Sequence, residues 1–177
     1  MRKLLLASLV VALFAGMAMA QITQTGTVNI NVPVAGLFTM ALTPASGSTI
    51  TYLTMSPGTS DNTTGVVDIL VRSNFKNNTW YLKVHQNQEL SDGAILETIP
   101  SANFTHTSTG GLGLHADAAA TQFSTGTATT FYTCDLTERK NIPAGTTITQ
   151  NMDLTIPLTQ AAGTYVNTLT YTLTVTP

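Results

Sequence analysis

Charged residues are scarce in this sequence, and so is cysteine. Charged side chains make up 9% of the 177 residues, the net charge at pH 7 is −2, and the basic residues form no cluster. Binding to phosphate backbones or anionic membrane surfaces needs concentrated positive charge, so neither is an expected partner. Cys134 is the single cysteine. That excludes an intramolecular disulfide and predicts a small buried side chain, with a reactive thiol or an intermolecular bridge as the alternatives.

Motifs that carry catalysis or bind metals are also missing. His85, His106 and His115 stand at no metal-ligand spacing, and we expect them on the surface. No G-x-S-x-G elbow occurs, and the G-x-G-x-x-A match at 111–116 lacks both a preceding strand and a following helix. We therefore predict no enzyme, no catalytic residue, no metal site and no cofactor. A hydrolase triad assembled from distant positions is the minor alternative.

Residues 1–20 have the pattern of a secretory signal peptide. Two basic residues open the segment, residues 4–13 are apolar, and Ala18-Met19-Ala20 is a small-x-small cleavage site. The apolar run is short for a membrane span, and no second one follows. We expect export to the extracellular space or cell surface, with periplasmic transit in a Gram-negative cell and no membrane span after cleavage. The remaining residues 21–177 fit one domain.

Threonine is abundant, at roughly one residue in five, well above its average usage. Between residues 165 and 176, Tyr165, Leu169, Tyr171 and Leu173 share one parity, whereas Thr fills most of the other parity. Side chains alternate with period 2 only in an extended strand, so the segment predicts a half-buried strand. Thr is β-branched and keeps an outer strand face polar without charge.

The rest of the chain follows the same pattern, with short strands separated by Pro and Gly turns. Residues 101–130 are expected to be loops with one or two short strands and a helical turn at 116–120. Glu138 to Asn141 reads as a solvated turn. We predict an all-β, immunoglobulin-like antiparallel β-sandwich of one domain, closed by a C-terminal hairpin of its last two strands. The expected strands cover residues 22–34, 37–42, 50–55, 65–72, 79–85, 94–99, 131–136, 147–158 and 165–176.

Trp80 is the only tryptophan. Its parity with Leu82 and Val84 predicts a core position. The alternative is a platform on which sugar rings stack, shared with Tyr81.

Two stretches resemble bacterial surface β-sandwich proteins. Residues 67–84 read VDILVRSNFKNNTWYLKV, and residues 162–173 read AGTYVNTLTYTL. They are similar to the WxL-domain cell-wall-binding proteins, in which two W-x-L motifs occur at about these places. Trp80-Tyr81-Leu82 matches the first motif, and Tyr171-Thr172-Leu173 stands at the second with Tyr in place of Trp. The resemblance implies a module that binds peptidoglycan or polysaccharide, with Trp80, Tyr81 and Tyr171 contacting the glycan.

The closing strand also resembles spore-coat-U-like and chaperone–usher pilin-like subunits. The resemblance implies polymerisation, in which an N-terminal strand completes a neighbour's open sandwich. The candidate donor strand follows the predicted cleavage site, and its apolar residues share one parity: Ile22, Val28, Ile30, Val32 and Val34. Pairing of this segment within its own sheet, as an ordinary first strand, is the alternative. The leading hypothesis is a non-enzymatic structural subunit of a surface fibre or coat that associates with itself, and the second is the glycan-binding module.

Overall fold

The computed structural model describes residues 29–94 and 96–177. The chain divides into two compact units, Met1–Val34 and Ala35–Pro177. All the strands in the described part of the chain belong to the second unit. They are β1 (Phe38–Thr43), β2 (Ser60–Ser73), β3 (Tyr81–Gln86), β4 (Leu90–Asp92), β5 (Glu97–Ile99), β6 (Phe104–Gly110), β7 (Leu114–His115), β8 (Thr121–Gln122), β9 (Thr129–Thr133), β10 (Thr146–Thr155) and β11 (Leu169–Thr174), with a 3₁₀ turn at Ser101–Asn103.

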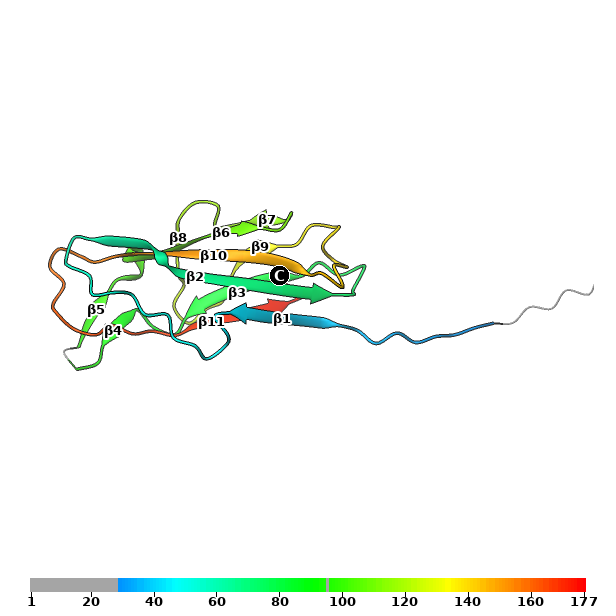
Figure 1. The fold of residues 1–177 in the computed structure, drawn as a ribbon, viewed down its shortest axis with the longest axis horizontal. Coiled ribbons are helices and arrows are strands. Elements are labelled where there is room, and N and C mark those ends of the chain that lie inside the picture. The colour runs from blue at the N-terminus through cyan, green and yellow to red at the C-terminus, as the bar shows by residue number, and fades with distance from the viewer. Residues whose placement is uncertain (1–28, 95) are drawn as a thin grey trace, which may run out of the picture. The chain divides into compact units, whose positions relative to one another are not determined.

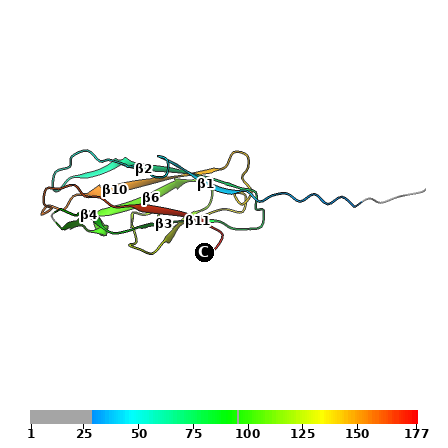
Figure 2. The ribbon, with the colours of Figure 1, turned by 90° about the horizontal axis from the view of Figure 1, so that it is seen from below.

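The second unit is an all-β sandwich, as the sequence predicts. One sheet has the order β1-β2-β10-β6-β8 and the other has the order β11-β3-β9-β7, while β4 and β5 form a separate small hairpin. Every pairing between the named strands is antiparallel. Figures 1 and 2 show the two layers from the front and from below.

The core lies between the two sheets and is built by alternation along the central strands. On β2, Val67, Ile69 and Val71 point inward, and the residues between them are more exposed. A strand that has one face against the core and the other face in solvent requires such alternation. The same pattern places Trp80, Leu82 and Val84 in the core from the other sheet, each with 0% exposure. Aromatic side chains fill the remaining space, namely Phe104, Phe123, Phe131 and Tyr132.

The predicted C-terminal hairpin is wrong. β10 pairs with β2 and β6, whereas β11 pairs with β3 in the facing sheet. The connection between β10 and β11 passes from one sheet to the other, and before β11 begins Val166 forms a two-way backbone pair with Ser91 of β4. Alternation identifies both strands correctly, but it carries no information about which neighbour each strand takes.

The least regular part of the sequence contains a central strand. β6 lies beside β10 within residues 101–130, where mostly loops were expected. Its inward residues include His106 and Ser108, so no apolar alternation reveals it. Residues 116–120 form turns instead of a helical turn, and residues 50–55 contribute Ile50, Tyr52 and Met55 to the core without forming a strand.

The N-terminal unit is described only from residue 29. Ile22, Val28 and the predicted signal peptide lie outside the described residues. Residues 29–34 contain no strand, so over these residues the expected ordinary first strand is not found. In the part of the chain that the structure covers, no helix has the length and apolar character needed to cross a membrane.

Candidate functional site

One side of the sandwich is open. β1 is the last strand of its sheet and β11 is the last strand of the other, and each pairs on one flank only. In Figures 1 and 2 these two strands run along the same side of the domain. Within the part of the chain that the structure describes, the outward amide and carbonyl groups of both strands therefore have no ladder partner. Unpaired edges of this kind are templates for another strand.

The two edge strands carry apolar side chains at alternate positions, and we call this set the seam. Its members pack against the core but stay half-buried, unlike the fully buried residues of β2 and β3. A covering strand would remove their remaining apolar area from water, at about 25 cal/mol per Å². The seam consists of Phe38, Met40 and Leu42 from β1 and of Leu169, Tyr171 and Leu173 from β11.

The opposite side of the sandwich is protected. Its edge strands, β7 and β8, are two residues long each. The chain passes from β6 in one sheet to β7 in the other and back to β8, so it wraps around this side. Short edge strands and covering loops prevent pairing with other chains. In residues 29–94 and 96–177, only the side with the seam offers long unpaired strands.

The described end of the N-terminal unit carries the pattern that a donor strand needs. Ile30, Val32 and Val34 are 83%, 70% and 82% exposed, and Asn29, Asn31 and Pro33 occupy the other parity. Alternate residues of a strand are about 6.6 Å apart, which is also the spacing of the seam residues along β1 and β11. Pro33 lacks an amide hydrogen, which a strand tolerates only at an edge.

A polar group lies at the floor of the seam. The Tyr171 hydroxyl donates to Gln150 Oε1 at 2.5 Å, and Gln150 is fully buried on β10. Burial raises the pKa of Tyr171 well above its ordinary value. This bond joins the edge strand β11 to the facing sheet.

The hydrogen-bond network of Gln150 extends to His106, although the sequence predicts a surface position for all three histidines. His106 is 2% exposed, so that expectation is wrong for it. Its Nδ1 lies 3.1 Å from Gln150 Nε2 and 2.7 Å from Asp117 Oδ2. Alternation with Phe104 and Ser108 along β6 is the only sequence signal for this burial, and it needs the strand to be recognised first.

Ser108, His115 and Asp117 are close together, but not in the order of a hydrolytic triad. The Ser108 hydroxyl donates to Asp117 Oδ1, and it lies 2.7 Å from His115 Nδ1. In a triad the carboxylate orients the histidine, whereas here it bonds the serine directly. His115 Nε2 is held by the Gly110 carbonyl, and Ser108 is buried between the sheets. The arrangement ties β6 to β7 and the following turn.

The three aromatic residues expected at a glycan do not form one surface. Trp80 is buried, and its indole N–H donates to the Glu138 carbonyl at 3.1 Å, so no ring face is left for a sugar. Tyr81 and Tyr171 are half-buried and lie on opposite faces of their sheet, because Tyr171 pairs with inward Val84. The core position of Trp80 is confirmed, and the shared platform is not found.

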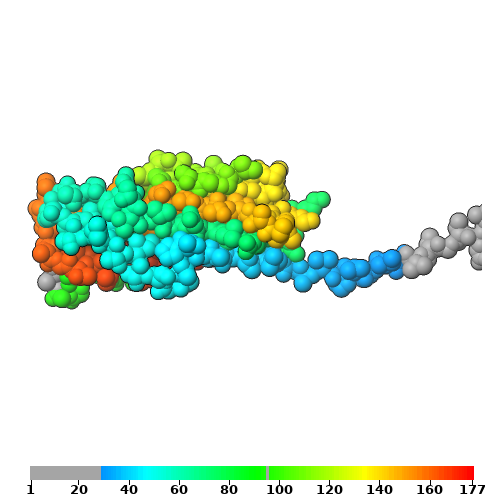
Figure 3. Space-filling model, in the orientation of Figure 1, coloured from blue at the N-terminus to red at the C-terminus, as the bar shows by residue number. Residues whose placement is uncertain are grey.

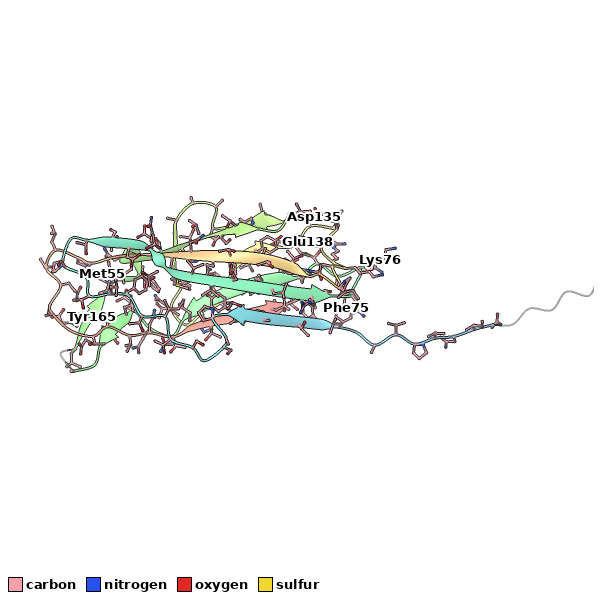
Figure 4. All side chains as sticks on the ribbon, in the orientation of Figure 1. Met55, Phe75, Lys76, Asp135, Glu138 and Tyr165 are labelled. Atoms are coloured by element: carbon pink, nitrogen blue, oxygen red, sulfur yellow. The ribbon has the colours of Figure 1, made fainter. Side chains whose placement is uncertain are left out.

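The turn at residues 138–141 is solvated only in part, because Lys140 is exposed whereas Glu138 is buried. Glu138, labelled with Asp135 in Figure 4, is 5% exposed. Its carboxylate accepts the Tyr132 hydroxyl at 2.6 Å and the Asp135 and Leu112 amides at 2.8 Å. Burial and the Glu138 bond raise the pKa of Tyr132. The turn is therefore a structural anchor for the end of β9 and for the chain before β7.

Cys134 is buried, as predicted. It is 7% exposed, and its Sγ accepts the Trp80 amide at 3.1 Å. Burial raises the pKa of the thiol, which disfavours the reactive thiolate. Within residues 29–94 and 96–177, no group of three or more His, Cys, Asp or Glu side chains is arranged to hold a metal ion.

The fold and the open side together define a β-sandwich with one exposed pair of edges. Comparison of the chain with protein-family models, with curated proteins and with solved structures finds no match. The function is therefore inferred from the geometry of this chain.

Proposed function

We propose that the protein is a non-enzymatic structural subunit that assembles by β-strand addition between copies. In this assembly, residues 28–34 of one copy lie along the open side of the next copy. The observation that carries the proposal is the pair of unpaired edges, β1 and β11, flanking a half-buried apolar seam. The chain itself supplies a segment of matching alternation in Ile30, Val32 and Val34, which are exposed.

The chemistry of the two surfaces is complementary. Each edge presents three apolar side chains at alternate positions, and the donor segment presents three with the same spacing. The main chain of the donor supplies hydrogen bonds to an edge, and its apolar side chains cover the seam. The donor and acceptor surfaces are different parts of the chain, so the contact is head-to-tail and continues into a fibre or sheet-like coat.

The expected place of this assembly is outside the cell. The predicted signal peptide supplies export, and cleavage after residue 20 would free the donor segment. A surface rich in Thr and poor in charge, with charged residues at 9% of the chain, puts little electrostatic repulsion between neighbouring copies.

Assembly of the purified mature protein tests the proposal. Light scattering and negative-stain electron microscopy would compare the unaltered chain with Ile30→Asp and with Asn31→Asp. Both variants add one negative charge to the same segment, but only Ile30 has the parity that faces the seam. We expect filaments or large assemblies from the unaltered chain and from Asn31→Asp, and none from Ile30→Asp.

Two outcomes would argue against strand addition. One is an unaltered chain that stays monomeric at all concentrations, including when a synthetic peptide of residues 28–34 is added and does not bind. The other is equal assembly by Ile30→Asp and Asn31→Asp, which would place the contact elsewhere.

A further inference from the structure

The residues between the donor segment and β1 have the composition of a hairpin loop. A three-residue hairpin loop commonly ends in a glycine with positive φ, and Val34-Ala35-Gly36 has its glycine at that place. With this loop, Val32 would lie opposite Phe38 of the same chain. Two residues further along, Ile30 would lie opposite Met40. The donor segment would then cover the seam of its own copy.

Such self-closure would compete directly with assembly between copies. A segment tethered to its target by a short loop has an effective concentration on the order of millimolar. A second copy seldom reaches that concentration, so an unrestrained donor segment would occupy its own seam first. A subunit that assembles by strand addition therefore needs a feature that disfavours a turn at residues 34–36.

Asn74, which directly follows β2, holds the chain at this place with three hydrogen bonds. Its backbone amide donates to the Leu37 carbonyl at 3.1 Å, and its Oδ1 accepts the Leu37 amide at 2.7 Å. Its Nδ2 donates to the Ala35 carbonyl at 2.8 Å. These bonds continue the pairing of β1 with β2 beyond Phe38 and Ser73. Figure 3 shows β1 along the lower margin of the domain, next to β2.

The ring of Phe75 also restrains this part of the chain. A Cβ added to Gly36 would lie 2.8 Å from Phe75 Cζ, so the ring lies directly against the glycine. The same ring contacts Phe38, with the two ring centroids 5.8 Å apart. Figure 4 shows Phe75 beside the start of β1. Gly36 does not have the positive φ of a loop-ending glycine, so closure would have to move Gly36 and release the Ala35 carbonyl from Asn74.

We propose that the Asn74 side chain keeps each copy from closing its own seam, which leaves the donor segment free for a second copy of this chain. Asn74 is a positioning residue in this account, because it acts on residues 35–37 and not on the donor segment itself. Replacing its side chain removes two hydrogen bonds that only the unclosed chain makes. The ratio of closed to unclosed copies should then rise about tenfold. The inference rests on the proposed assembly, since it concerns what regulates that contact.

Disulfide trapping in dilute mature protein measures self-closure. In the closed hairpin, Asn31→Cys and Thr39→Cys would face each other across a pair with Cα atoms about 4.5 Å apart, which a disulfide can span. A non-reducing gel separates the internally linked monomer from linked copies. We expect the linked monomer to increase about tenfold when Asn74→Ala is added to this double-cysteine chain. Without the two cysteines, Asn74→Ala should assemble less than the unaltered chain in light scattering at the same concentration.

The matched control is Asn78→Ala, at an exposed asparagine of the same β2–β3 connection. It should leave trapping and assembly unchanged within about twofold, and superimposable circular dichroism spectra would show that both variants are folded. Equal trapping with Asn74 and with Asn74→Ala overturns the inference, as does undiminished assembly of Asn74→Ala. If the unaltered chain does not assemble but Asn74→Ala still raises trapping, the proposed assembly fails, whereas the control of self-closure by Asn74 is supported.

Discussion

Single polar side chains connect the two sheets of this protein where an apolar core alone would be expected. Gln150 stands in the inward row of β10 beside Ile148 and Met152, and is fully buried. It is tolerated there because the Tyr171 hydroxyl from the facing sheet and His106 from β6 both contact its amide. A buried amide without such partners would be strongly destabilising. The inward row of β10 therefore holds the two sheets together by specific hydrogen bonds as well as by apolar packing.

Tyrosine ionisation gives a prediction at the residue scale. Burial, with the nearby charges of Asp61 and Asp153, raises the pKa of Tyr52 to about 12. The pKa values of Tyr132 and Tyr171 are raised further, chiefly by burial. In a spectrophotometric titration of the folded protein, these three of the five tyrosines should not ionise near pH 10, where an exposed tyrosine does.

The same shifts set the direction of the alkaline stability change. Below about pH 10 the folded and the unfolded chain both keep these tyrosine protons. The contribution of the three tyrosines to the free energy of unfolding is then at its full value. Above about pH 10 the unfolded chain releases protons that the folded chain keeps, so stability falls as pH rises through the folded pKa. The urea-unfolded protein is the control and should show all five tyrosines titrating together. If all five tyrosines of the folded protein also titrated together near pH 10, the buried environments of Tyr52, Tyr132 and Tyr171 would be contradicted.

At the scale of the elements, the turn after β6 depends on glycine. Gly110 has a φ of +90°, and an added Cβ would lie 2.6 Å from the backbone carbonyl oxygen of Thr147. Gly126 also has a positive φ, of +74°, but nothing lies within 4 Å of its added Cβ. Comparing a substitution at Gly110 with one at Gly126 therefore separates the cost of backbone strain from the cost of a steric clash with a neighbouring strand.

We expect Gly110→Ala to destabilise the protein more than Gly126→Ala. Backbone strain should lower the free energy of unfolding by about 1 kcal/mol at either position. The clash with β10 should add roughly 1–3 kcal/mol at Gly110 only. Urea unfolding followed by circular dichroism measures both values. Equal losses in the two variants would show that β6 and β10 separate easily at this point.

Apolar alternation decides which elements the sequence reveals. β2, β3, β10 and β11 carry Val, Ile and Leu at alternate positions, so their existence and inward faces are predictable. β6 is not, because its inward row reads Phe104, His106 and Ser108. Strand pairing is also hidden, because alternation fixes a strand's faces but leaves its neighbours open. The donor segment is visible in the sequence, whereas the seam appears only once β1 and β11 are known to be edges.

At the scale of the whole molecule, the compact β-domain should not need the N-terminal segment for stability. Ile30, Val32 and Val34 are exposed, and the core consists of residues from the second unit. We expect removal of residues 21–34 to change the free energy of unfolding by about 0.5 kcal/mol or less. The truncated protein should stay monomeric in size-exclusion chromatography with light scattering. A loss of several kcal/mol would mean that the segment belongs to its own domain's fold.

The single open side also gives the proposed assembly a direction. Because β7 and β8 are two residues long each, the long unpaired edges among the described residues lie on one side, so each copy in this assembly has one place to receive a strand and one strand to give. The two ends of a growing fibre are then chemically different, with an empty seam at one end and an unused donor at the other. A copy without residues 21–34 can occupy a donor but offers none, so it acts as a chain terminator. Small amounts of it would set fibre length.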